Sequence, residues 1–439
     1  MTLTTLDSPE KTQVGSYFVA TYPPFSAWSP AHVGAALEQL DAPGSDARPL
    51  GLYLHIPFCR KRCKFCYFRV YTDKNAADVE DYLKALGDEV GMYAQRGGLR
   101  GRQFEFVYFG GGTPSFLSSE QLLRLIDRIR RHWTWDAARE VTFECEPGTL
   151  KQSKVQAIRS IGVTRLSLGV EHFDDEILAA NGRAHRGPEV LRAFGWAREA
   201  GFAQINIDLI AGMLGEDGAK WKRAVDRAIE LDPDSVTIYQ MELPFNTIIS
   251  REARLLGGLA PVADWPAKRQ MAQWAFERFE EAGYVVSSAY TLVRPERHAG
   301  FVYRDALWHG ADMVGTGVAS FSHFGGVHFQ NADTWEDYLR SLGGGQLPIH
   351  RALPTTPRQR LIRELILQLK LGRVQTGYFR RKFSADILAE FAGAWESLVA
   401  EGLARVEPDA VALSREGLLR VDALLPRFYE EQYRNVRYT

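Results

Sequence analysis

The chain has 439 residues, with 53 Lys and Arg side chains against 54 Asp and Glu and a formal net charge of −1. This balance gives no long-range attraction for nucleic acid or for an anionic membrane surface, so we expect neither as a partner. Hydrophobic residues make up 45% and charged residues 24%, which are ordinary globular values and exclude a disordered or fibrous chain. Because one hydrophobic core rarely serves so long a chain, we expect one large domain with a smaller one attached.

No segment predicts a membrane span or an export signal. The chain lacks a run of about 18 uncharged apolar residues, and its start has neither a basic nor an apolar stretch. The chain also has only four cysteines, which does not suit a secreted protein held together by disulfides. These features predict a cytoplasmic protein with no transmembrane segment.

The first 50 residues are expected to form an N-terminal arm that is rich in aromatic side chains. Residues 17–28 read YFVATYPPFSAW. Such a run most often packs over a neighbouring core. We therefore assign residues 1–50 to this arm.

From residue 51 onward, short β-branched or aromatic runs alternate with longer amphipathic stretches, which is typical of repeated βα units around a parallel sheet. Six such units predict an α/β fold with a partial or complete (β/α)6 TIM-like barrel over residues 51–349. The expected strands are Gly51–Ile56, Phe104–Phe109, Glu140–Cys145, Arg165–Val170, Gln204–Ile210 and Ser235–Gln240. The expected crossover helices include Asp78–Arg96, Ser119–His132, Pro188–Ala200 and Trp221–Leu231.

Residues 350–439 have a different composition and are expected to form a small C-terminal helical domain with a winged element. Thr356–Lys370 is predicted to be a basic helix and Ala385–Glu401 an apolar one. Leu403–Ser414 predicts two strands joined by a turn. The modest net charge of this region does not indicate DNA binding.

Polar residues follow most of the predicted strands. In parallel α/β folds the carboxyl ends of the strands meet on one rim, where chemistry gathers. We therefore expect these groups to converge on a single site. They are residues 55–59 (HIPFC), 110–114 (GGGTP), 144–147 (ECEP), 171–173 (EHF), 206–208 (NID) and 240–242 (QME).

Three of the four cysteines, Cys59, Cys63 and Cys66, stand within eight residues directly after the first strand. This spacing is typical of a metal centre. A structural zinc site would need a fourth ligand, for which His55 is available. A [4Fe-4S] cluster held by three thiolates would leave one iron open to another ligand, and we favour this interpretation. Cys145 alternates with Glu144 on a strand and is expected to be a core residue.

The motifs together resemble those of a known family. Residues 53–66 (YLHIPFCRKRCKFC) and 108–114 (YFGGGTP) are similar to the radical S-adenosylmethionine (SAM) superfamily, and within it to the oxygen-independent coproporphyrinogen III oxidase-like (HemN-like) family. The resemblance continues through residues 144–147, 165–171 and 206–210 and covers almost the whole chain. It implies a barrel of the radical SAM type closed by a C-terminal lid.

The resemblance also implies cofactors and site residues. A [4Fe-4S] cluster would bind to Cys59, Cys63 and Cys66, and one SAM, and by analogy a second, would lie beside it. Tyr53 and Glu144 are the candidate catalytic residues. The candidate cofactor-binding residues are Tyr53, Gly110, Gly111, Gly112, Thr113, Glu144, Glu171, Arg183 and Asp208 for the first SAM, and Met241 and Trp308 for the second.

The chain departs from the family pattern where specificity is expected. Phe68 replaces a further cysteine, and Glu171 replaces a glutamine that contacts SAM in the family. Residues 240–242 read QME instead of Tyr-Ala-His, and Trp308 replaces a glutamine. No compact arginine cluster in the sequence indicates a clamp for several carboxylates.

Three functions fit these motifs. The first is oxidative decarboxylation of coproporphyrinogen III or a related tetrapyrrole. The second is methylation or cyclopropanation of an unsaturated organic substrate by a class C-type enzyme with a second SAM. The third is a haem-binding chaperone, for which His323 and His328 could face a planar ligand, although such relatives lack the Tyr-Pro segment present here at residues 22–23.

The cysteine loop carries a basic run, Arg60-Lys61-Arg62-x-Lys64. A reductant must approach any cluster held by this loop, and complementary charge speeds such an encounter. We therefore expect an acidic electron donor of the flavodoxin or ferredoxin type as a protein partner.

Overall fold

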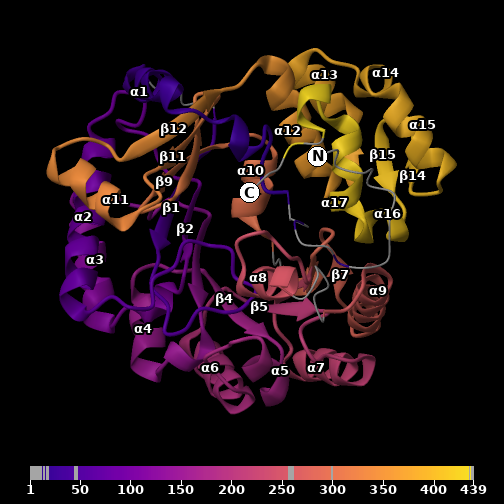
Figure 1. Cartoon of the computed structure of the whole chain (residues 1–439), viewed down its shortest axis with the longest axis horizontal. Helices are drawn as coiled ribbons and strands as arrows, with labels where there is room; N and C mark the ends of the chain where they lie inside the picture. Colours follow the sequence, from indigo (N-terminus) through magenta and orange to yellow (C-terminus); the bar gives the residue numbers. More distant parts are fainter. Residues whose placement is uncertain are drawn as a thin grey trace.

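The computed structural model describes residues 12, 15, 19–43, 48–255, 262–297, 300–434 and 436. One 12-stranded sheet curves around the centre of the molecule, and an outer layer of helices covers its convex side (Figure 1). Its strands lie in the order β12-β11-β10-β9-β1-β2-β3-β4-β5-β6-β8-β7. The run from β9 through β1 to β6 is parallel, and the strands on either side of it are antiparallel.

All six strands expected from the sequence are present, with shifts of one or two residues at some ends. They are β1 (Leu50–Ile56), β2 (Phe106–Gly111), β3 (Glu140–Cys145), β4 (Arg165–Glu171), β5 (Gln204–Ala211) and β6 (Ser235–Gln240). The sheet is extended by β7 (Val285–Val286), β8 (Thr291–Val293), β9 (Asp312–Thr316), β10 (Phe321–Phe324), β11 (Val327–Asn331) and β12 (Ile349–Pro354).

The four expected crossover helices are confirmed, and further helices join them. In the barrel these are α2 (Ala76–Ala94), α3 (Ser119–Arg130), α4 (Gln152–Ser160), α5 (Asp175–Ala180), α6 (Gly187–Ala200), α7 (Gly218–Leu231), α8 (Ile248–Leu255), α9 (Trp265–Glu281), α10 (Val302–Trp308) and α11 (Trp335–Gly343). Short 3-10 turns lie at Pro114–Phe116, Pro147–Thr149 and Pro295–Arg297.

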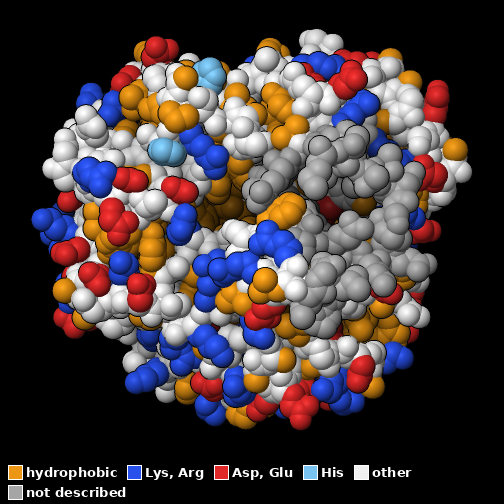
Figure 2. Space-filling view, viewed as in Figure 1, with side chains coloured by type: hydrophobic (Ala, Val, Ile, Leu, Met, Phe, Trp, Pro, Cys, Tyr) orange, Lys and Arg blue, Asp and Glu red, His pale blue; other side chains and the backbone are white. Residues whose placement is uncertain are grey.

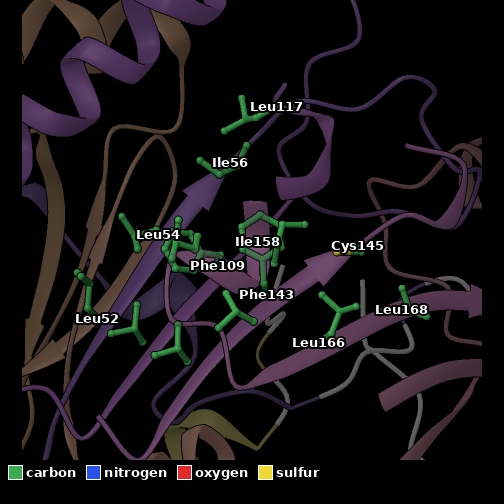
Figure 3. Close-up of a cluster of buried hydrophobic side chains, with 14 of the residues drawn as sticks. Leu52, Leu54, Ile56, Phe109, Leu117, Phe143, Cys145, Ile158, Leu166 and Leu168 are labelled. Carbon is green, nitrogen blue, oxygen red and sulfur yellow. The ribbon is translucent and has the colours of Figure 1, made fainter. Parts of the chain in front are cut away.

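Alternation along the strands separates a hydrophobic layer from the site. Leu52, Leu54 and Ile56 of β1 point toward the helices and pack with Phe109 and Phe143 (Figure 3). Cys145 belongs to this buried cluster, as the sequence predicted. The side chains between these positions point to the opposite face, because successive residues of a strand alternate. The inner face of the barrel therefore carries the polar residues.

The C-terminal segment forms a second hydrophobic cluster around α12 (Pro357–Leu369). The sequence predicted a basic helix here, yet nearly every side chain of α12 after Arg360 is buried. The other elements are β13 (Arg373–Gln375), α13 (Thr376–Phe383), α14 (Ile387–Glu390), α15 (Ala392–Ala400), β14 (Ala404–Val406), β15 (Ala410–Leu413), α16 (Arg415–Leu419), α17 (Val421–Leu424) and 3-10 turns at Leu425–Phe428 and Glu431–Tyr433.

The expected single helix over Ala385–Glu401 is wrong, because the structure divides it into α14 and α15. Phe391 lies between them with φ −120° and ψ 30°, outside the helical range. Its ring packs against Phe428 at 5.6 Å between centroids, and burial of this ring accompanies the break. The predicted pair of strands over Leu403–Ser414 is confirmed as β14 and β15, to which β13 adds a third strand.

The N-terminal arm joins the barrel to the C-terminal elements. It contains turns at Phe25–Ala27 and Pro30–His32 and one helix, α1 (Val33–Asp41), that the sequence did not predict. Tyr22 donates a hydrogen bond from its hydroxyl to Glu430, and Ser29 forms a β-bridge with Ala352 of β12. Residues 17 and 18 of the aromatic run lie outside the described residues.

None of the helices in the described part of the chain combines the length and the apolar run that crossing a bilayer requires.

Candidate active site

A wide cavity of about 2700 Å³ opens on the inner face of the barrel. Figure 2 shows it as a hollow near the centre of the molecule, with hydrophobic atoms in its depth and Lys and Arg side chains below its opening. Its wall includes the cysteine loop, inner residues of β1 to β6, the N-terminal arm and C-terminal residues. A usual small-molecule site occupies about 300–1,000 Å³, so this cavity has room for more than one ligand.

The pairing of β1 with β2 brings the cysteine loop and the glycine-rich turn together. The two strands are parallel, and Ile56 at the end of β1 lies opposite Gly111. Cys59 follows Ile56 by three residues, and its Sγ lies 3.3 Å from the Thr113 hydroxyl. Two motifs that are about 50 residues apart in the chain thus share one corner of the cavity.

The three loop cysteines all line the cavity. Burial, together with the neighbouring Cys63, raises the pKa of Cys59 to about 11 and that of Cys66 to about 12. Cys59 and Cys66 are therefore protonated thiols at neutral pH, and a metal would displace their protons on binding. Among the described residues no three Cys, His, Asp or Glu side chains meet closely enough to ligate one metal ion. A polynuclear cluster does not need such a meeting point, because each thiolate binds a different iron.

The turn Gly110–Gly112 has no room for side chains. Gly111 has φ +114°, a conformation that other residues rarely adopt. A Cβ at Gly112 would lie 2.8 Å from the backbone of Pro57, just before the cysteine loop. Gly111 and Gly112 line the cavity, whereas Gly110 packs behind them against the tyrosines of β1 and β2. The turn can therefore offer its backbone to a ligand beside the cysteines.

Three partly buried carboxyl groups face the cavity from neighbouring strands: Glu144 at the end of β3, Glu171 at the end of β4 and Asp208 in β5. Burial, together with the nearby Asp208 carboxylate, raises the pKa of Glu144 and of Glu171 to about 7. Tyr108 opposes this shift in Glu144, since its hydroxyl donates a hydrogen bond of 2.6 Å. Three such groups suit a ligand with hydroxyl or ammonium donors.

Arg183 connects the carboxyl groups to the cysteine loop. Its Nη1 lies 3.3 Å from the Cys63 Sγ and 3.5 Å from the Glu171 carboxylate. Its Nη2 donates to the Gly169 carbonyl. The backbone of Glu171 has φ +63°, which is unusual for a residue other than glycine. The β4–β5 pairing is also irregular between Gly169 and Glu171. This local irregularity directs Glu171 toward Arg183.

Tyr53 forms the aromatic wall beside the glycine turn. Its ring stacks on Tyr108 with 5.8 Å between centroids, and Tyr108 in turn contacts Tyr303 at 4.2 Å. Burial raises the pKa of Tyr53 well above 10. The Tyr53 hydroxyl is therefore uncharged at neutral pH, and its ring offers an aromatic face to the cavity.

The two residues predicted for a second SAM occupy different places. Met241 lines the cavity within a small apolar cluster. Trp308 packs in the C-terminal hydrophobic cluster and is not among the described residues that line the cavity, although its neighbour Leu307 is. Phe68, which stands in place of a cysteine, is 46% exposed and lies at the cavity wall.

His185, which comes from a distant segment, was not predicted from the sequence. Glu146 accepts hydrogen bonds from Arg60 beside the first loop cysteine and lies 3.0 Å from His185. Arginines from separate segments line the cavity, although the sequence shows no compact cluster of them. They include Arg60, Arg62, Arg165, Arg183, Arg254, Arg269, Arg351, Arg363 and Arg420.

Comparison with known proteins agrees with this geometry. Residues 53–228 match the radical SAM superfamily. The chain is 30% identical over 401 residues to the oxygen-independent coproporphyrinogen III oxidase of Pseudomonas aeruginosa, covering 87% of this chain and 85% of that protein. It is 29% identical over 380 residues to the heme chaperone HemW of Mycobacterium tuberculosis, covering 86% and 94%. The coproporphyrinogen III oxidase (HemN) structure from Escherichia coli superimposes with a TM-score of 0.82 at 23% identity, over 94% of this chain and 96% of that one.

The chain belongs to the radical SAM superfamily and, within it, to the HemN-like family that includes oxygen-independent coproporphyrinogen III oxidases and HemW chaperones. The fold is that of HemN, with a partial radical SAM barrel and a helical C-terminal part.

Replacement of Glu171 by Gln tests the electrostatics of the partly buried carboxyl groups. The folded-state pKa of Glu171, about 7, is above the value near 4.5 of an unfolded chain, so the folded state holds this proton more tightly. The wild type therefore loses stability as pH rises between these values, and E171Q does not. The measured quantity is the unfolding free energy of E171Q minus that of the wild type, from urea denaturation of the metal-free proteins. We expect this difference to increase by about 1–3 kcal/mol from about pH 5 to about pH 8.

The matched control is E176Q on α5, whose carboxylate is exposed and lies 3.3 Å from Lys220. Its effect should be the same at both pH values. If the unfolding free energies of E171Q and E176Q relative to the wild type change equally with pH, the pKa of Glu171 is not raised in the folded protein.

Proposed function

We propose that this protein is a radical SAM enzyme that acts on a tetrapyrrole, with oxidative decarboxylation of coproporphyrinogen III as the favoured reaction. The observation that carries the proposal is the convergence of three cysteines, a glycine turn and three partly buried carboxyl groups on one cavity of about 2700 Å³. The similarity to coproporphyrinogen oxidases over most of the chain supports the substrate class.

In this proposal Cys59, Cys63 and Cys66 hold three irons of a [4Fe-4S] cluster, and the fourth iron is open to SAM. When bound, the cluster supplies the electron that cleaves the SAM sulfonium into methionine and a 5′-deoxyadenosyl radical. The loop partly shields the three cysteine side chains from solvent, and this burial raises the pKa values of the Cys59 and Cys66 thiols.

The residues around the cysteines would bind and orient SAM. The backbone of Gly112 would approach its amino-acid part, and the Arg183 guanidinium would pair with its carboxylate. Glu144 and Asp208 would accept hydrogen bonds from the ammonium group or the ribose hydroxyls. The Tyr53 ring would pack beside the sulfonium, because an aromatic face attracts positive charge.

The proposed reaction removes a hydrogen atom from the β-carbon of a propionate side chain, which converts the radical into 5′-deoxyadenosine. The substrate radical then loses carbon dioxide and passes one electron to an acceptor from outside the chain, leaving a vinyl group. Phe25 and Trp28 of the arm line the cavity and would keep water from the radical. A second SAM has room beside Met241, whereas Trp308 would not touch it.

Two other functions have support from particular observations. The altered residues 240–242 favour a class C-type methylase or cyclopropanase with an unsaturated substrate. The similarity to HemW favours a haem chaperone. The imidazoles of His323 and His328 are hydrogen-bonded to each other, which gives no support for axial ligation of haem by the pair.

Product analysis distinguishes these functions. The cluster is reconstituted without oxygen, and SAM, dithionite and coproporphyrinogen III are added. We expect 5′-deoxyadenosine and the loss of two carboxyl groups from the tetrapyrrole by mass. C63A should form no 5′-deoxyadenosine, whereas C145A, which changes a cysteine of the hydrophobic core, should keep the activity.

Other outcomes contradict the favoured reaction in different ways. S-adenosylhomocysteine or methylthioadenosine with a gain of mass on an unsaturated substrate would indicate the methylase. Tight haem binding without SAM cleavage would indicate the chaperone. Cleavage of SAM with no change in the tetrapyrrole would exclude coproporphyrinogen III as the substrate.

We also propose that the cysteine loop receives an acidic electron donor of the flavodoxin or ferredoxin type. The basic residues of the loop do not all remain available for a partner. Arg60 pairs with Glu146 at 2.8 Å, and Arg62 donates to the Cys66 carbonyl. Lys61 is exposed at the edge of the cavity, which makes it the residue to test.

Charge reversal in K61E should slow cluster reduction by flavodoxin several-fold at low ionic strength, because complementary charge speeds encounter. Reduction by dithionite should be unchanged. K84E reverses an exposed lysine on α2 and serves as the control. Equal slowing with both reductants, or none with flavodoxin, would refute a docking role for this loop.

A further inference from the structure

Arg363 is a buried cation that faces the cavity. It lies on α12, is 5% exposed and lines the cavity wall. Within the described part of the chain it donates no hydrogen bond and forms no ion pair, and its buried Nε has no partner. An isolated buried charge is costly unless an anion compensates it.

Glu364 and Asp312 are the carboxylates that act electrostatically on Arg363, and both are bound to other groups. Glu364 accepts hydrogen bonds from Lys382, at 2.8 Å, and from Tyr378. Asp312 pairs with Arg48 and with Arg102, at 3.4 and 3.3 Å. The anion that compensates Arg363 is therefore expected to come from a ligand in the cavity.

Two histidines beside Arg363 have tautomers that their contacts define. His328 Nε2 lies 3.0 Å from the Tyr22 carbonyl oxygen, which can only accept, so this nitrogen carries a proton. Burial lowers the pKa of His328 to about 3 and that of His323 well below 6.5, and Arg363 lowers both further, so both rings are neutral.

It follows that His328 Nδ1 accepts a hydrogen bond from His323 Nδ1, 3.0 Å away. His323 Nε2 is then an acceptor, and it makes no hydrogen bond among the residues that the structure describes. Trp28 of the arm stacks on His328 with 5.1 Å between centroids and an angle of 4°, which fixes the ring. Both histidines line the cavity.

We infer that Arg363 and His323 form a subsite for a carboxylate-bearing substrate, in which Arg363 pairs with a carboxylate and His323 Nε2 accepts a hydrogen bond from an N–H donor of the same ligand. The inference rests on the proposed function for the choice of ligand: coproporphyrinogen III carries propionate groups on the outer edge of its pyrrole rings and N–H groups on the inner edge. The subsite is built from β10, β11 and α12 and is separate from the cysteine loop and the glycine turn. Tyr22 of the arm holds the histidine pair in the required tautomer.

The test compares R363Q with R360Q in the cluster-reconstituted protein. Arg360 lies on the same helix, donates to the Thr355 carbonyl at 2.7 Å and is not among the described residues of the cavity wall. Coproporphyrin III and its tetramethyl ester are titrated under anaerobic conditions, with binding followed by fluorescence quenching. We expect R363Q to bind coproporphyrin III at least tenfold more weakly than the wild type, since a charge-assisted hydrogen bond in a buried site is lost. R360Q should bind it as the wild type does, and the ester should bind R363Q and the wild type equally.

Thermal stability separates this role from a structural one. R363Q should melt at the same temperature as the wild type without ligand or at a higher one, because it removes an uncompensated buried charge. A lower melting temperature would mean that Arg363 stabilises the fold through a partner of its own and would overturn the inference. Equal binding of coproporphyrin III by R363Q and the wild type would overturn it while leaving the proposed function intact.

If the wild type does not bind coproporphyrin III, the proposed substrate is wrong, and the carboxylate subsite is tested with a smaller probe. 3-Phenylpropionate should then raise the melting temperature of the wild type more than 3-phenylpropanol does, and this difference should disappear in R363Q. No difference between the wild type and R363Q would overturn the inference.

Discussion

The parallel register of β1 and β2 is the constraint on which the site depends. With Ile56 opposite Gly111, the two chains leave the sheet side by side, and Gly112 then contacts the backbone of Pro57 so closely that a Cβ would not fit. The cysteine loop and the glycine turn therefore form one surface. A cluster held by the first would lie beside a ligand held by the second, which is the arrangement that the proposed cleavage of SAM needs.

The cavity combines groups of both charges that are not all neutralised within the protein. Glu144 and Glu171 have raised pKa values on one wall, and Arg363 has no anion partner among the described residues on another. Such an arrangement costs stability in the free protein. It suits a zwitterionic cofactor on the side of the carboxyl groups and an anionic substrate on the side of α12. The size of the cavity allows both to be present together.

The sequence predicted the six parallel strands and the convergence of their polar ends, because period-two alternation and strand-end motifs are local signals. It did not predict the division of α14 from α15 or the burial of α12, since both depend on packing against distant side chains. The sequence singled out His323 and His328 but could not predict their hydrogen bonds, because His328 is held by the Tyr22 carbonyl, 306 positions away in the chain. The arginines of the cavity come from many separate elements and form a group only after folding.

The most direct test of this account is the electron paramagnetic resonance spectrum of the reduced, reconstituted protein before and after addition of SAM, in the wild type and in G112A. The account predicts an iron–sulfur signal in both proteins, because the cysteines alone hold the cluster. SAM should change the signal of the wild type and not that of G112A, whose extra methyl group would separate the glycine turn from the cysteine loop. A wild type with no cluster signal, a signal that SAM leaves unchanged, or an identical response in G112A would contradict it.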